Sequence, residues 1–201
     1  MRLGVKYTLK AVSNIGVKLL IVMSIFLSSC GYKVGNLNRS MPEEVKLVAV
    51  PTFKNATGEA GLEGFFTNAV LEEIIKARFV KLAPQKKAEA VLEGKVISIR
   101  YVPQGTNVAD SSNNQLPTGT ALTSSYDVQV VVNLRLRRRS DNKILWATTV
   151  SGSRTYQAAQ IGESGFNSAN AIYNYSAKKY TMGLLSKSLM TQAFSRMTEG
   201  F

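Results

Sequence analysis

The stretch that decides the fold is DVQVVVNLRLRRRSDNKILWATTV, residues 127–150. From Val128 to Leu136 every second residue is apolar, and most residues between them are polar. This is the period of a β-strand that buries one face. A charged turn at 138–143 follows, and Trp146 is expected to anchor the packed face. The chain then returns with alternate residues on one face, namely Ile144, Trp146, Thr148 and Val150. The pattern predicts a β-hairpin with one side packed on a core.

The segments around the hairpin predict two further strands and two helices. Strands are expected at 45–50, which Pro51 ends, and at 88–101, where Gly94 suggests a bulge or a close approach of another group. The helical stripes have 3.6-residue spacing. Their members are Leu62, Phe66, Val70, Ile74 and Ala77 in the first helix, and Met182, Leu185, Leu189, Ala193 and Met197 in the second, which covers 177–198.

The order β-α-β-β-β-α predicts an α+β two-layer sandwich, with two helices packed on one face of a four-stranded sheet. Residues 103–120 are polar and are expected to form a long loop, and residues 152–174 are expected to be irregular. No repeat or linker divides the rest of the chain. We therefore expect a single domain over 44–201.

The first 29 residues are typical of an export signal. Four basic residues precede a nine-residue apolar run, 19–27, which is too short to span a bilayer as a helix. Leu27-Ser28-Ser29-Cys30 resembles the bacterial lipobox, in which the Cys is acylated and cleavage occurs just before it. Cys30 is the only Cys of the chain, so it cannot form an internal disulfide. We expect 1–29 to be a lipoprotein signal peptide and 30–43 an acylated N-terminus and tether, with diacylglycerol and an N-acyl chain such as palmitate on Cys30.

Charge and composition narrow the classes of function. Removing the four basic residues of the signal from the total of 25 leaves 21, against 13 acidic residues. Such a surplus of positive charge favours an anionic partner, either lipid or a phosphorylated glycolipid. Nucleic acid is not expected as the partner, because the signal predicts export from the cytoplasm. The chain has no His, which is the usual general base and a common metal ligand. We expect neither catalysis nor a metal site, although a carboxylate-based hydrolase stays open in principle.

Five basic residues gather at one end of the hairpin. They are Arg135, Arg137, Arg138, Arg139 and Lys143, called the hairpin cluster below. Solvated charges of this kind hinder edge-to-edge pairing of sheets. The same charges could contact an anionic headgroup, so the cluster is a candidate binding site for a phosphorylated glycolipid, and the sequence leaves both interpretations open.

Several motifs together carry a family resemblance. Cys30-Gly31-Tyr32 is followed after the tether by VAVPTFKNAT at 48–57 and by Gly61-Leu62-Glu63 at the start of a helix. With the Leu92-x-Gly94-x-Val96 strand, the basic turn and the C-terminal helix, this resembles the lipopolysaccharide-assembly lipoprotein family, LptE. The resemblance implies an outer-membrane lipoprotein, with Cys30 as its anchor, that plugs the β-barrel LptD, assists its assembly and binds lipopolysaccharide.

The resemblance also implies where the domain lies. It would face the periplasm or occupy the barrel lumen, and Gly31 in place of an Asp after the Cys favours the outer membrane. The polar face of the hairpin would suit a polar lumen; its members are Gln129, Asn133, Arg135 and Arg137.

Two other classes of lipoprotein share the VAV strand. An activator of a peptidoglycan synthase must reach across the periplasm, whereas the ten-residue tether here extends only about 35 Å. A subunit of a secretion pore needs an amphipathic hairpin that inserts in lipid. Arg135 and Arg137 on the polar face oppose this, because an Arg facing lipid costs about 2–4 kcal/mol at the bilayer midplane. Both classes remain alternatives to the LptE interpretation.

Overall fold

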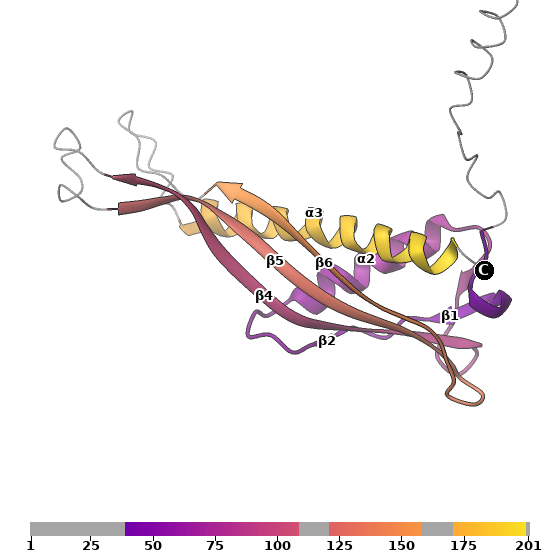
Figure 1. Ribbon diagram of the computed structural model, residues 1–201. Helices are drawn as coiled ribbons and strands as arrows, with labels where there is room; N and C mark the ends of the chain where they lie inside the picture. Colours follow the sequence, from indigo (N-terminus) through magenta and orange to yellow (C-terminus); the bar gives the residue numbers. More distant parts are fainter. Residues whose placement is uncertain (1–38, 109–120, 158–170, 200–201) are drawn as a thin grey trace, which may run out of the picture. The chain divides into compact units, whose positions relative to one another are not determined.

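One mixed sheet organises the structure, a computed structural model that describes residues 39–108, 121–157 and 171–199 (Figure 1). The strand order is β3-β1-β4-β5-β6, and the short β2 also pairs with β4. The expected signal peptide, Cys30 and most of the tether lie outside the described residues. In chain order the elements are η1 (Pro42–Glu44), β1 (Leu47–Ala49), β2 (Lys54–Asn55), α2 (Leu62–Lys76), β3 (Lys81–Leu82), β4 (Ala90–Val108), β5 (Ala121–Arg138), β6 (Ile144–Gln157) and α3 (Ala171–Thr198).

The predicted hairpin is confirmed as β5 and β6, and β4 pairs with its other side. Both pairings are antiparallel, with Leu134 opposite Gly94 on β4 and opposite Thr148 on β6. All five alternating apolar residues between Val128 and Leu136 are at most 1% exposed. Trp146 is half-buried and packs against the core, as expected of an anchor.

The sheet has six strands, not the four expected from the sequence. The two additions, β2 and β3, have two residues each and run parallel to their partners β4 and β1. No alternation can be recognised over two residues, so the sequence pattern carries no signal for them.

The long strands extend further than predicted. β4 continues to Val108 and β5 begins at Ala121, so the expected loop is wrong at its first six residues, and 109–120 lie outside the description. Likewise, 152–157 belong to β6 rather than to an irregular segment, and α3 begins at Ala171 rather than 177. Tertiary pairing overrides the weak local propensity of these polar stretches.

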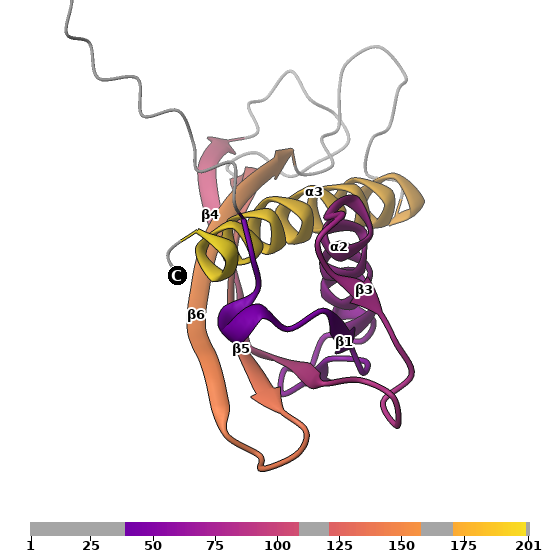
Figure 2. The same cartoon turned by 90° about the vertical axis from the view of Figure 1, so that its right-hand side faces the viewer.

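As predicted, both helices lie on the same face of the sheet; they also pack against each other (Figures 1 and 2). Within the stripes, Leu62, Phe66, Val70 and Ile74 of α2 are at most 2% exposed. Ala77 caps the end of α2 and is half-buried. The five stripe residues of α3 are at most 4% exposed. The core is therefore the layer between the two helices and the apolar side of the sheet.

The strands depart from regular geometry and register near Gly94 and at the turn end of the hairpin. At Gly94 a Cβ would lie 2.3 Å from the ring of Phe53, which confirms a close approach. The bulge is elsewhere, between Val96 and Ser98. A second register shift at Leu136–Arg137 pairs Ile144 with Arg137 and leaves Ile144 53% exposed, so its expected place on the packed face is wrong.

Candidate functional site

The face of the sheet opposite the helices is hydrophilic. The β5 residues that alternate with the buried ones are, apart from Val131, polar or charged, and all are exposed or half-buried. Their β6 partners are small: Thr155, Ser153, Ser151, Thr149 and Ala147 face Asp127, Gln129, Val131, Asn133 and Arg135. This helix-free face therefore presents hydroxyls, amides and a few charges.

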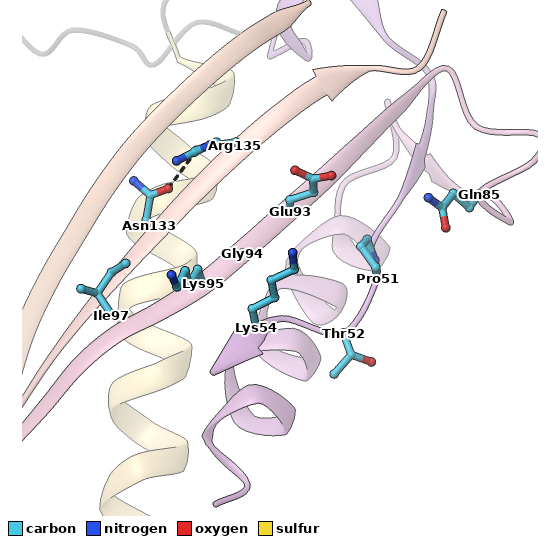
Figure 3. Close-up of a pocket in the computed structure, with 10 residues that line it drawn as sticks. All are labelled: Pro51, Thr52, Lys54, Gln85, Glu93, Gly94, Lys95, Ile97, Asn133 and Arg135. Carbon is cyan, nitrogen blue, oxygen red and sulfur yellow. Dashed lines mark hydrogen bonds between the residues drawn. The ribbon is translucent and has the colours of Figure 1, made fainter. Parts of the chain in front are cut away.

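A hollow of about 610 Å³ opens where this face meets the chain segment that leads into β2 (Figure 3). Most of the residues drawn there belong to β2, β4 and β5 and lie on the side away from the helices, while Pro51, Thr52 and Gln85 come from connecting segments (Figure 3). We call it the sheet groove, and its lining residues are Pro51, Thr52, Lys54, Gln85, Glu93, Gly94, Lys95, Ile97, Asn133 and Arg135.

Phe53 fixes the wall of the sheet groove. Its ring is 3% exposed and occupies the space that a side chain at Gly94 would need. Its backbone N–H donates to Oγ1 of Thr67 on α2, at 2.9 Å. Since successive side chains of an extended segment point to opposite sides, a buried Phe53 turns Lys54 outward into the groove.

Three basic side chains from three neighbouring strands line the groove. Lys54 of β2 is in register with Lys95 of β4, and Lys95 is in register with Asn133 of β5. Arg135 donates through Nε to Oδ1 of Asn133, at 3.2 Å. Within the described part of the chain, neither Lys54 nor Lys95 forms an ion pair.

The acidic residue of the groove, Glu93, already has a partner. Its Oε1 lies 2.6 Å from a guanidinium nitrogen of Arg137. Arg137 also donates to Oδ1 of Asn142 in the turn. The charge of Glu93 is thus shared with Arg137, and the groove keeps a positive surplus from Lys54, Lys95 and Arg135.

The structure divides the hairpin cluster. Arg138 pairs with Glu43 of η1 and with Asp141, the latter at 2.8 Å, and Lys143 lies 3.1 Å from Glu43. Arg139 donates through Nε to the carbonyl of Ala88, at 2.8 Å. Arg135 lines the sheet groove, whereas the other four residues connect the turn to neighbouring segments.

The turn is attached to η1, at the end of the expected tether. Met41 is 1% exposed and Pro42 is also buried, while Glu43 and Glu44 have left-handed φ angles of 52° and 55°. The backbone N–H of Lys143, helped by Arg138, holds the pKa of Asp141 below its ordinary value. A second hollow of about 440 Å³ lies here, lined in part by Glu43, Lys87 and Arg139.

Sequence reasoning missed the two lysines of the sheet groove. Lys54 lies on a strand too short to recognise, so nothing in the pattern indicates its direction. Lys95 could have been found, because Leu92-Glu93-Gly94-Lys95-Val96 alternates and places Glu93 and Lys95 together on the polar face. Only the pairing of β2 with β4 brings the two lysines together.

Two searches of the described residues were negative. Over 39–108, 121–157 and 171–199, no helix combines the length and the apolarity needed to cross a membrane. In the same ranges, His, Cys, Asp and Glu do not gather in groups of three that could hold a metal ion.

Comparison with known proteins assigns the family. Residues 45–198 match the family described as LptE, lipopolysaccharide-assembly. No curated protein matches the chain. Solved structures with similar chains include the PelC dodecamer from Paraburkholderia phytofirmans (18% identity, 81% of this chain and 95% of that chain covered, TM-score 0.46). Another is a minor lipoprotein from Acinetobacter baumannii (18% identity, coverage 76% and 90%, TM-score 0.42). Because the match spans nearly all of the described residues, this chain belongs to the lipopolysaccharide-assembly family LptE.

Proposed function

We propose that the protein is an outer-membrane lipoprotein of the lipopolysaccharide transport and assembly machinery. In this proposal it occupies the lumen of an LptD-like β-barrel, assists the assembly of that barrel, binds lipopolysaccharide and has no catalytic role. The family match over residues 45–198 carries the proposal. Acylation of Cys30 and cleavage before it would anchor the protein, through the tether, to the membrane.

The helix-free face of the sheet supports the proposed position in a barrel. The interior of a large outer-membrane barrel is polar. A plug needs a matching surface whose hydroxyls and amides can hydrogen-bond to lumen side chains or to water. Gln129 and Asn133 on β5, with Thr149 and Ser151 on β6, offer such groups without a continuous apolar patch.

Lipopolysaccharide binding is assigned, as a proposal, to the hairpin cluster. An arginine has five N–H donors, so one that already contacts a carboxylate or carbonyl can still donate to an anionic headgroup. Of the five residues, Arg135 is the most informative to change, because the only hydrogen bond of its side chain within the described residues is to Asn133. Arg138 is less suitable, since its substitution would also break the link to Glu43.

Co-purification tests the proposed partner. The acylated protein would be isolated from its native membrane in mild detergent, and the co-purifying proteins identified by mass spectrometry. A stoichiometric LptD-like barrel is the expected result. A peptidoglycan synthase, or a ring of identical subunits, would favour one of the two alternative lipoprotein classes and refute the plug. A Cys30→Ala precursor should carry no labelled acyl chain and should leave the membrane fraction.

Binding of labelled lipopolysaccharide tests the hairpin cluster. Arg135→Glu should weaken binding at low salt by about tenfold, which corresponds to about 1.4 kcal/mol. Arg196→Glu is the matched control, because Arg196 is exposed on α3 and makes no ion pair within the described residues. Equal binding by wild type and Arg135→Glu would remove Arg135 from the proposed site.

A further inference from the structure

Two lysines lie in register with each other in the sheet groove. The register of β2 and β4 places Lys54 directly opposite Lys95. Neighbouring strands are about 4.8 Å apart, and directly opposed like charges destabilise a sheet. Neither ammonium has an ion pair within the described residues to offset this repulsion.

The surrounding groups suit an oxyanion. Arg135 and Asn133 both belong to β5, and Asn133 is in register with Lys95 on β4. Ammonium, guanidinium and amide groups therefore line the same hollow (Figure 3). Lysine and arginine together are a common environment for phosphate, which accepts several charge-assisted hydrogen bonds. The volume of about 610 Å³ falls within the range of about 300–1,000 Å³ that is typical of small-molecule sites.

We propose that the sheet groove is a binding site for a phosphate group, with Lys54 and Lys95 as its principal ligands and Arg135 beside them. Its location differs from the turn end of the hairpin cluster, because Lys54 and Lys95 belong to β2 and β4. In the machinery proposed above, the phosphate is that of a phosphorylated glycolipid. That identification rests on the proposed function, whereas the presence of a phosphate site does not.

Phosphate explains the lysine pair better than a merely solvated surface does. Two solvated lysines need not lie in register, and either could be replaced by Thr or Gln to relieve the repulsion without loss of core packing. A bound phosphate turns the same repulsion into shared attraction, because each ammonium then contacts the anion between them. The pair should consequently cost stability without the ligand and contribute to affinity with it.

Lysine footprinting on the wild-type protein is the first test. The acylated protein in detergent would be reductively methylated with and without inorganic pyrophosphate, intact lipopolysaccharide or enzymatically dephosphorylated lipopolysaccharide, and the modified sites mapped by mass spectrometry. We expect pyrophosphate and intact lipopolysaccharide to protect Lys54 and Lys95, and the dephosphorylated form to give little protection. Lys81 is the internal control, because it is exposed on β3 and has no ion pair within the described residues.

Substitution is the second test. Lys54→Gln and Lys95→Gln should each weaken lipopolysaccharide binding by about tenfold, and the double variant by about a hundredfold if the contributions add. Lys81→Gln removes the same charge and should change affinity by less than about twofold, as expected for a residue outside the site. The ligand-free melting temperatures of the groove variants should equal or exceed that of the wild type, which separates lost binding from lost folding.

The outcomes separate this proposal from the proposed function. Protection by pyrophosphate but not by lipopolysaccharide would support the phosphate site and reject the glycolipid as its ligand. Co-purification of the barrel with a Lys54→Gln/Lys95→Gln variant that has lost phosphate binding would support both. Equal protection of Lys81, or an equal loss of affinity in Lys81→Gln, would overturn the site and reduce the lysine pair to general surface charge.

Discussion

Replacing Gly94 with Ala tests whether Phe53 is locked against β4. A Cβ at this position would lie 2.3 Å from two ring atoms of Phe53 and 2.5 Å from a third. Carbon atoms in contact are normally about 3.5–4.0 Å apart, so the ring must move by more than about 1 Å. Phe53 is 3% exposed, and its backbone N–H donates a hydrogen bond to Thr67, so a shift of the ring disturbs the core.

The energy change has two opposing parts. Overpacking of a core typically costs about 1–3 kcal/mol, and three overlapping ring atoms place this case near the upper end. Loss of the glycine's freedom in the unfolded chain offsets about 0.4–1 kcal/mol. We therefore predict a net destabilisation of about 2 kcal/mol, which lowers the melting temperature by roughly 4–8 °C in a domain of this size.

A double-mutant cycle measured by chemical denaturation isolates the Phe53 contact. In a Phe53→Leu background the shorter, flexible side chain can yield, so Gly94→Ala should cost at least about 1 kcal/mol less than in the wild type. Additive costs would refute the reasoning, because they would mean that the alanine is accommodated, or resisted, by something other than the ring.

Three further predictions concern packing, the turn and pH. Gly152→Ala should destabilise by no more than about 1 kcal/mol in urea unfolding, because the nearest atom, Cδ2 of Leu189 at 2.9 Å, is the end of a flexible side chain; a cost like that of Gly94→Ala would contradict this. Arg138→Ala should lose at most about 1 kcal/mol, since its side chain is 31% exposed, and the loss should shrink at high salt as the pairs with Glu43 and Asp141 are screened; a salt-independent loss would point to packing instead. Burial raises the pKa of Tyr101, so its contribution to stability is complete below the ordinary tyrosine pKa of about 10 and is lost as pH rises through the folded-state pKa. Tyr101→Phe should therefore lose less stability than the wild type between about pH 9 and pH 11 in thermal melts; identical slopes would exclude this hydroxyl as the cause.

The hairpin could be predicted because its information is local. The pattern consists of five alternating apolar residues, a charged turn and a returning strand. It identifies the buried face of the first strand and the strand that pairs with it, without reference to the rest of the chain. The helices were recognisable for the same reason. In contrast, the position of β2 depends on the packing of Phe53 against Gly94, which lies about 40 residues further along the chain. No sequence pattern in either segment predicts that contact.

In the candidate site, too, local features could be predicted from the sequence and long-range contacts could not. The hairpin cluster was visible because its five residues lie within nine positions of the sequence. Their partners were not, since Glu43 and Glu93 reach Arg138 and Arg137 only through the fold. A count of charges therefore overestimates how much of a basic cluster faces a ligand, while a lysine pair created by strand pairing escapes notice.

α3 follows the strands that it covers in the order of the chain, and this order has a consequence for biogenesis. Seven of its hydrophobic residues, from Met182 to Met197, are at most 6% exposed, so the part of the sheet's apolar side that α3 covers stays exposed until this helix docks. A nascent chain lacking these residues cannot complete its core. For the exported precursor proposed above, we expect this order to delay completion of the core until α3 has been synthesised, which would suit passage of an unfolded chain through a narrow translocation channel. A variant truncated before Ala171, which lacks α3, should accordingly be degraded by proteases instead of accumulating as a shortened but working protein.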